Sequence, residues 1–212
     1  MKIGVFDSGK GGETVLAAIK ELLPNEEYFY IGDSKNCPYG EKSDEELMQI
    51  VRGHVETLKK WGARIIVIAC NTATTRCIAK LRNEYSELKF VGTEPAIKLA
   101  AGTGAKRILV MATPGTIASE RTARLMKEYQ QKKQKIRLLA CPGLADAIEA
   151  NKGVKEKLME LLSKIPEPEV VVLGCTHYSL IKPEIQEFFP EAKLIDGNKG
   201  VAKRVEELIK QR

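Results

Sequence analysis

Long hydrophobic runs are missing from this sequence of 212 residues. Hydrophobic residues make up 43% of the chain and charged residues 29%, and the apolar segments are far shorter than a membrane span. The first residues also lack the charged and apolar regions of a signal peptide. We therefore expect a cytoplasmic globular protein that does not associate with a membrane.

Cysteine and histidine are also scarce, at five and two residues. The cysteines are Cys37, Cys70, Cys77, Cys141 and Cys175. Their number is odd and their spacing does not show the close pairs that hold structural zinc, so the sequence indicates neither a disulfide framework nor a metal site. We expect free thiols in a reducing compartment and no bound metal.

Aromatic residues, which many nucleic-acid-binding proteins use to stack on bases, make up only 6% of the chain. The formal net charge of +6 and the pI of about 9 would suit a nucleic-acid-binding protein. The densest basic cluster, in residues 127–137, has no aromatic-rich strand or metal-finger motif beside it. We therefore expect no nucleic-acid partner.

Two apolar stretches of the chain each end at a cysteine, and the two cysteines are 105 residues apart. Ile65–Ala69 is short and rich in β-branched residues, as strands buried on both faces are, and it leads into Cys70. Val170–Gly174 leads into Cys175 in the same way. Polar residues follow both cysteines. We predict that each thiol lies beside a helix N-terminus, which would lower its pKa.

The chain repeats one order of strands and helices twice. Ile3 and Ile108 begin corresponding strands, and Cys37 and Cys141 begin corresponding loops. Strands that alternate with amphipathic helices predict parallel sheets covered by helices. We therefore predict an α/β fold of two pseudo-symmetric domains, each a parallel sheet flanked by helices. The active site is expected in the interdomain cleft, because such sheets bind ligands at the carboxyl ends of their strands.

Four short motifs follow strand ends in both halves of the sequence. They are Asp7-Ser8-Gly9, Pro38-Tyr39-Gly40, Cys70-Asn71-Thr72-Ala73-Thr74 and Gly174-Cys175-Thr176-His177-Tyr178. In this order, and over nearly the whole chain, they resemble the glutamate racemases of the wider aspartate/glutamate racemase superfamily. The resemblance implies a first domain of residues 1–93 plus 190–212 and a second domain of residues 94–189. Without it, the pattern alone places a boundary near Glu94.

The resemblance implies a cofactor-independent enzyme that racemises glutamate and supplies D-glutamate for peptidoglycan synthesis. Cys70 and Cys175 would exchange protons with opposite faces of the substrate Cα, with Asp7 and His177 as their helpers, and Glu149 keeps a carboxylate position of the family. The residues expected to hold the amino-acid substrate are Ser8, Pro38, Tyr39, Gly40, Asn71, Thr72, Thr113, Thr116 and Thr176. A homodimer is the oligomeric state that we consider for this protein.

Thiols suit the transfer of a proton from and to the Cα atom of an amino acid. The α-hydrogen of an amino acid is a very weak acid, and the adjacent carboxylate makes its removal harder. Pyridoxal phosphate would act as an electron sink for this step, but no lysine of the sequence lies in an obvious context for the Schiff base that holds this cofactor. Positioned bases and donors must then stabilise the developing charge, and a cysteine pKa near the working pH allows one thiolate and one thiol to coexist.

Other hypotheses stay open at this point. Cys70 and Arg76 have the C-x5-R spacing of cysteine phosphatases, although the loop between them contains no glycine to wrap a phosphate. A racemase for aspartate or for several amino acids would use the same two cysteines, and a non-catalytic protein could bind an amino acid with the same residues. Packing roles alone are expected for Cys37, His54, Cys77 and Cys141.

Overall fold

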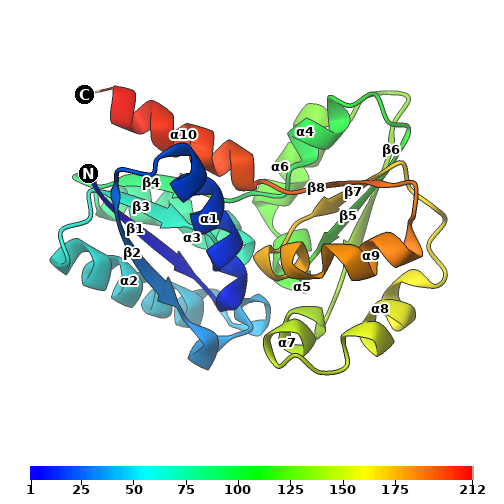
Figure 1. Ribbon diagram of the computed structural model, residues 1–212, viewed down its shortest axis with the longest axis horizontal. Helices are drawn as coiled ribbons and strands as arrows, with labels where there is room; N and C mark the ends of the chain where they lie inside the picture. The colour runs from blue at the N-terminus through cyan, green and yellow to red at the C-terminus, as the bar shows by residue number, and fades with distance from the viewer. Residues whose placement is uncertain (212) are drawn as a thin grey trace.

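The computed structural model describes residues 1–211 as two α/β halves, each built on a four-stranded parallel sheet (Figure 1). The first sheet has the order β2-β1-β3-β4 and consists of β1 (Lys2–Asp7), β2 (Glu27–Gly32), β3 (Ile65–Ile68) and β4 (Lys89–Gly92). The second has the order β6-β5-β7-β8 and consists of β5 (Arg107–Ala112), β6 (Lys135–Ala140), β7 (Val170–Leu173) and β8 (Lys193–Ile195). The predicted α/β fold class is confirmed.

The duplication extends to the pairing register of the strands. Val5 of β1 pairs with Val67 of β3 in the first sheet, and Val110 of β5 pairs with Val172 of β7 in the second. Both residues of the second pair lie 105 positions after those of the first. The strands that lead to the two cysteines therefore occupy equivalent positions. All four residues of β3 and of β7 are buried, as the unbroken β-branched runs predict.

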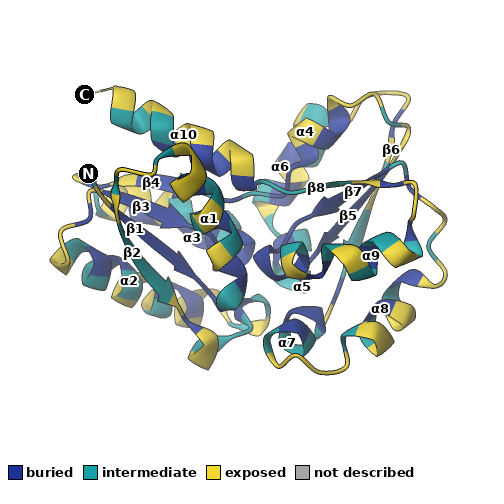
Figure 2. Ribbon diagram, in the orientation of Figure 1, coloured by how far each residue is buried: buried dark blue, intermediate teal, exposed yellow. Residues whose placement is uncertain are grey.

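Helices cover both sheets and turn their exposed faces outward, as the burial colours in Figure 2 show. The helices of the first half are α1 (Glu13–Leu22), α2 (Asp44–Lys60), α3 (Asn71–Glu84) and α10 (Asn198–Lys210). Those of the second half are α4 (Ile97–Ala101), α5 (Pro114–Ile117), α6 (Glu120–Tyr129), α7 (Leu144–Glu149), α8 (Val154–Leu162) and α9 (Lys182–Phe188). Short 3₁₀ helices are η1 (Lys10–Gly12), η2 (Ser34–Asn36), η3 (Tyr39–Glu41) and η4 (Thr176–Ile181). Among residues 1–211, no helix has the length and apolar character needed to cross a bilayer.

Helix α2 illustrates how the sequence sets these boundaries. The side chain of Ser43 caps its start by accepting a hydrogen bond from the Glu46 N–H group at 3.1 Å. The helix ends at Lys60, and Gly62 follows with a φ of +91°, a conformation that glycine adopts without a steric penalty. The buried face of the helix consists of Leu47, Met48, Val51, Val55 and Leu58.

The last part of the chain differs from the prediction. Residues 190–212 were expected in the first domain, but β8 pairs with β7 and extends the second sheet. Only α10 returns to the first half, where Val201 and Val205 are buried in one cluster with Ile3 and Ile19. The chain therefore crosses between the halves after β8. A strand of three residues carries too little pattern to show which sheet it joins.

Candidate active site

Residues from both halves surround one small cavity at the carboxyl ends of the two sheets. The cavity is lined by Ser8, Cys37, Pro38, Tyr39, Gly40, Cys70, Asn71, Thr72, Thr113, Ala145, Cys175 and His177. The space left for the centre of a water-sized molecule is about 10 Å³, roughly what one water requires. Two cysteines that are 105 residues apart thus face one enclosed site from opposite halves of the protein.

Cys70 lies between the end of β3 and the first turn of α3, where it is the N-cap residue. Burial and the charge of Asp7 raise the pKa of its thiol to about 12. The N–H groups of Ala73 and Thr72 and the hydroxyl of Ser8 oppose this shift without cancelling it. The prediction that the helix N-terminus lowers this pKa is therefore wrong, because loss of solvation outweighs the helix dipole at a thiol that is 5% exposed.

Cys175 follows β7 and precedes η4. Its sulfur lies 3.9 Å from the Nδ1 atom of His177. Burial and the neighbouring Cys70 raise the pKa of the Cys175 thiol well above its ordinary value, although the backbone N–H group of His177 favours the thiolate. The predicted lowering is wrong here as well. The turn after Cys175 is a 3₁₀ helix, and the α-helix expected there begins only at Lys182.

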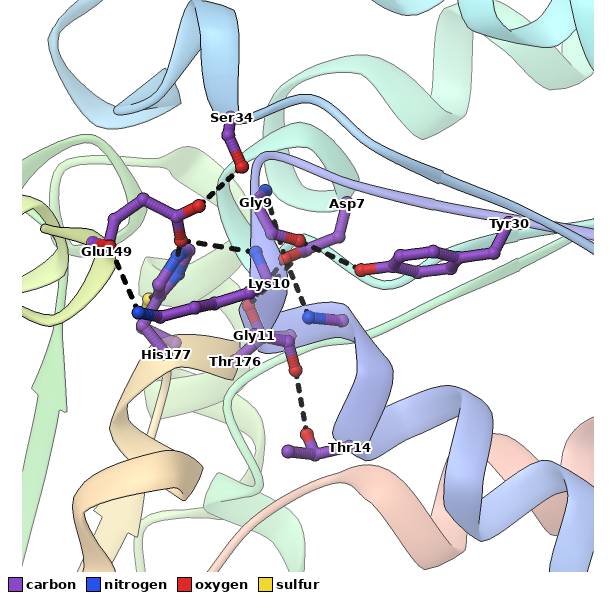
Figure 3. A network of polar contacts seen from close by, with 12 residues as sticks. Asp7, Gly9, Lys10, Gly11, Thr14, Tyr30, Ser34, Glu149, Thr176 and His177 are labelled. Carbon is purple, nitrogen blue, oxygen red and sulfur yellow. Dashed lines mark hydrogen bonds and ion pairs between the residues drawn. The ribbon is translucent and has the colours of Figure 1, made fainter. Parts of the chain in front are cut away.

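A single carboxylate, that of Glu149, connects His177 to the first half of the protein (Figure 3). Its Oε2 atom lies 2.6 Å from Nε2 of His177 and accepts the Lys10 N–H at 3.1 Å, while its Oε1 atom accepts a hydrogen bond from the Ser34 hydroxyl. The Lys10 ammonium also donates to the Glu149 carbonyl at 3.0 Å. Burial would raise the pKa of Glu149, but these hydrogen bonds outweigh it and the pKa is lowered.

Sequence reasoning did not find the partners of Glu149. Lys10 and Ser34 lie 139 and 115 residues away from it along the chain. The available signal was Lys10 itself, a charged side chain that directly follows the Asp7-Ser8-Gly9 motif. Ser34 gave no comparable signal, since a serine in a polar loop is unremarkable by itself.

Asp7 is fully buried at the boundary between the halves. It accepts hydrogen bonds from the N–H groups of Gly12 at 2.8 Å and Gly9 at 3.4 Å, and from the Thr176 hydroxyl at 3.2 Å. Burial raises the pKa of Asp7 despite these donors and the nearby His177. Asp7 therefore holds the first-half loop against the residue that follows Cys175, and it influences Cys70 through its charge.

The loop after β1 approaches the second half very closely. A Cβ atom at Gly11 would lie 2.5 Å from the backbone nitrogen of His177 and 2.8 Å from the hydroxyl oxygen of Thr176. Only glycine leaves room for this approach. The loop is thereby held directly against η4, the segment that carries His177 and follows Cys175.

Three hydroxyl groups predicted to bind the substrate meet beside the cavity, whose lining includes Thr72 and Thr113 but not Thr116. Thr72 Oγ1 lies 2.8 Å from Oγ1 of Thr113 and 3.1 Å from Oγ1 of Thr116. The neighbouring Asn71 is 4% exposed, and its Nδ2 atom has no hydrogen-bond partner among residues 1–211. A buried donor without a partner is costly, so this amide is suited to an acceptor on a bound ligand.

Tyr39, another predicted binding residue, is held by a cluster that the sequence did not reveal. Its hydroxyl donates to Oδ2 of Asp33 at 2.7 Å and lies 3.0 Å from Nε2 of His54, which is itself 2.9 Å from the same carboxylate oxygen. Burial and the hydrogen bond to Asp33 raise the pKa of Tyr39. His54 contacts the ring of Phe6, as expected of a packed histidine, but it also fixes Tyr39 at the cavity.

Arg76 decides between the racemase and phosphatase hypotheses. Its guanidinium donates to Asp44 Oδ1 at 2.6 Å and to the Lys42 carbonyl at 2.8 Å, and its NH1 group reaches the Tyr39 carbonyl at 3.5 Å. These bonds direct the guanidinium to the first residue of α2 and to the segment before this helix. A cysteine phosphatase needs the arginine of its motif on the bound phosphate, so this geometry argues against that hypothesis.

Three cysteines were expected to have packing roles alone, and the structure confirms this environment for two of them. Cys77 and Cys141 are buried in the hydrophobic cores of the two halves. Cys37 instead lines the cavity and is half-buried. Its sulfur and the ligand atoms of Glu149 and His177 lie within 4.8 Å of one another, which is a spacing that could hold a metal ion.

Comparison with known proteins gives consistent matches over the whole chain. Residues 3–205 match the family described as Asp/Glu/Hydantoin racemase. The chain is 41% identical to the glutamate racemase of Clostridium perfringens strain 13, with 99% of this chain and 83% of that protein covered. The crystal structure of Escherichia coli glutamate racemase in complex with L-glutamate and the activator UDP-MurNAc-ala is 32% identical, covers 99% of this chain and 82% of its own, and superposes with a TM-score of 0.88. Glutamate racemase from Francisella tularensis in complex with D-glutamate gives 27% identity, coverage of 99% and 81%, and a TM-score of 0.82.

Proposed function

This chain belongs to the Asp/Glu/hydantoin racemase family, and we propose that it interconverts L- and D-glutamate with Cys70 and Cys175 as its two proton-transfer groups. The observation that carries the proposal is that these two thiols, one from each half, line the same cavity. Inversion at Cα requires one proton acceptor and one proton donor on opposite faces of the carbon. The duplicated fold supplies that pair.

The substrate enters when the two halves move apart. The cavity described above holds about one water, and glutamate is much larger. The contacts that close it include the bonds of Glu149 to Lys10 and Ser34 and the bond of Thr176 to Asp7. Opening exchanges these hydrogen bonds for bonds to water and separates the loop at Gly11 from η4.

His177 assists the ionisation of Cys175. Because the pKa of Glu149 is lowered, its carboxylate is charged near neutral pH and accepts a hydrogen bond from the Nε2–H group of His177. The Nδ1 atom of a neutral imidazole is then free to accept the proton of the Cys175 thiol, 3.9 Å away. Burial holds both thiols in the protonated form, and this route offers one of them a proton acceptor.

Neutral donors bind the carboxylates of the substrate and the charge that develops at Cα. The unpaired amide of Asn71 and the hydroxyl groups of Thr72 and Thr113 line the cavity, and the Thr116 hydroxyl lies 3.1 Å behind that of Thr72. Oriented dipoles in a site without bulk water stabilise such charge more effectively than solvent does. Tyr39 and Gly40 also line the cavity, and Gly40 lies against the side chain of Thr113.

A circular dichroism assay on the metal-free protein tests the proposal. We expect conversion of either glutamate enantiomer, with solvent deuterium at Cα of the new enantiomer in heavy water. Cys70→Ala and Cys175→Ala should each lower kcat by about 100-fold or more, because each removes an acid/base group. Cys77→Ala, which changes a buried thiol outside the cavity, is the matched control. Full activity of either active-site variant would overturn the proposal.

The finer expectations need separate experiments. Turnover of aspartate without turnover of glutamate would keep the two-thiol mechanism and change the substrate. The supply of D-glutamate for peptidoglycan synthesis would be tested by rescue of a D-glutamate auxotroph. Homodimer formation and a cytoplasmic location stay predictions, to be tested by sedimentation equilibrium and by cell fractionation.

A further inference from the structure

Three potential metal ligands come together at the edge of the active-site cavity. The Cys37 sulfur, a Glu149 carboxylate oxygen and a His177 ring nitrogen all lie within 4.8 Å of one another. Cys37 follows η2 in the first half, whereas Glu149 ends α7 and His177 lies in η4 of the second half. We propose that these three side chains form an inhibitory Zn²⁺ site that bridges the two halves.

The donor set suits zinc better than the other common divalent cations. Thiolate sulfur, imidazole nitrogen and carboxylate oxygen are the three ligand types of protein zinc sites, whereas Mg²⁺ and Ca²⁺ require oxygen ligands. Three protein ligands leave one position of a tetrahedral zinc ion for water or a small anion. One thiolate and one carboxylate also balance the charge of the ion.

The required movement of the ligands is small. Ligand atoms about 2.0–2.3 Å from a tetrahedral zinc ion are roughly 3.2–3.8 Å apart. His177 Nε2 and Glu149 Oε2 are 2.6 Å apart and must separate slightly. The Cys37 sulfur lies within 4.8 Å of the other two ligand atoms and must move closer to them. The Ser34 hydroxyl and the Lys10 N–H already orient the carboxylate, as outer hydrogen bonds do in metal sites (Figure 3).

Zinc at this site would block the proposed reaction in two ways. A zinc ion on Nε2 of His177 leaves the neutral ring with its proton on Nδ1, so the ring can no longer accept the proton of Cys175. The ion also links Cys37 of the first half to two residues of the second, which opposes the opening that admits substrate. This inhibitory effect rests on the proposed function, but metal binding itself does not.

Direct binding of Zn²⁺ to the full metal-free protein is the first test. Competition with a chromophoric chelator should show one tight site per chain, weakened at least tenfold in Cys37→Ser and in Glu149→Gln. Cys77→Ser makes the same chemical change outside the cluster and should bind as the wild type does. Co²⁺ should give a thiolate charge-transfer band that Cys37→Ser lacks. Far-ultraviolet circular dichroism establishes that each variant is folded.

Activity measurements form the second test. Zn²⁺ should inhibit glutamate racemisation, a chelator should restore it, and Cys37→Ser should need at least tenfold more Zn²⁺ for the same fractional inhibition. Equal zinc affinity in Cys37→Ser and the wild type would overturn the site, as would zinc binding that depends on Cys70 or Cys175 instead. Zinc binding that depends on Cys37, in a protein without racemase activity, would overturn only the proposed function.

Discussion

His177 and Glu149 contact each other through Nε2 and Oε2 at 2.6 Å, where the side chain of His177 is 1% exposed and that of Glu149 is 17% exposed. His177 is fully buried, and the opposite nitrogen of its ring faces the Cys175 sulfur. The proposed mechanism requires this carboxylate to hold the imidazole proton on Nε2.

Glu149→Gln tests whether Glu149 assists proton transfer to His177. A neutral amide cannot stabilise the imidazolium that forms when His177 takes the Cys175 proton, and loss of a hydrogen bond to a charged group costs ~1.5–3 kcal/mol, which is about 10- to 100-fold in kcat. We expect a loss in kcat with a smaller change in KM, measured by circular dichroism. Glu156→Gln, a change in the first turn of α8, is the matched control. A kcat equal to that of the wild type would contradict the role assigned to Glu149.

Thr72→Val tests the hydroxyl cluster. Valine has nearly the same shape but removes the hydroxyl shared with Thr113 and Thr116, so we expect KM for glutamate to rise by about tenfold, as for the loss of one hydrogen bond worth ~1.4 kcal/mol. Thr75→Val is the control, because that hydroxyl donates to the Thr72 carbonyl outside the cavity lining. Equal KM values for the two variants would exclude a binding role for the cluster.

Asp33→Asn tests the cluster that holds Tyr39. Burial would raise the pKa of Asp33, but hydrogen bonds from Tyr39, Asn36 and His54 lower it, so the charged form is the stabilising one near neutral pH. Replacing it should lower the free energy of unfolding by ~1–3 kcal/mol and raise KM, as measured by urea denaturation and by the racemisation assay.

Asp44→Asn provides a comparison for this variant. Asp44 forms an ion pair with Arg76, but its side chain is 67% exposed, so its replacement should cost less than about 1 kcal/mol.

The stabilising contribution of Asp33 should also disappear in acid. Because its folded-state pKa is lowered, that contribution is present above the unfolded value of 3.8 and is lost as the pH falls through the folded value. Similar losses of stability in the two variants at neutral pH would contradict the assignment.

Alkaline pH should destabilise the protein through its buried thiols. The pKa of Cys70 is raised from 9.0 to about 12, so between these values the folded chain binds more protons than the unfolded chain. The stabilising contribution is complete below pH 9 and is lost as the pH rises towards 12, at up to ~1.4 kcal/mol per pH unit. Cys70→Ser should flatten this decline in urea titrations from pH 8 to higher values. An unchanged slope would show that the thiol ionises equally in both states.

The sequence was sufficient to predict the architecture and most of the lining of the site. Unbroken β-branched runs such as Ile65–Ile68 are typical of strands covered on both faces, and their repetition after 105 residues implies two similar sheets. Polar motifs that follow parallel strands must meet at the same edge of each sheet. In agreement with this rule, one cavity is lined by Cys70 and Cys175 together with Ser8, Pro38, Tyr39, Gly40, Asn71, Thr72 and Thr113, whereas Thr116 and Thr176 are not among its lining residues.

Tertiary structure alone decided the electrostatics and the partners. A helix N-terminus after Cys70 was visible in the sequence, but the depth of burial that overrides it depends on how the two halves close. The pairing of β8 depends on which sheet has a free edge beside it. Cys37 had no informative spacing from Glu149 or His177, because contacts between distant segments arise only when separate elements are brought together. Local patterns record how each segment is buried, whereas solvation and long-range contacts belong to the folded whole.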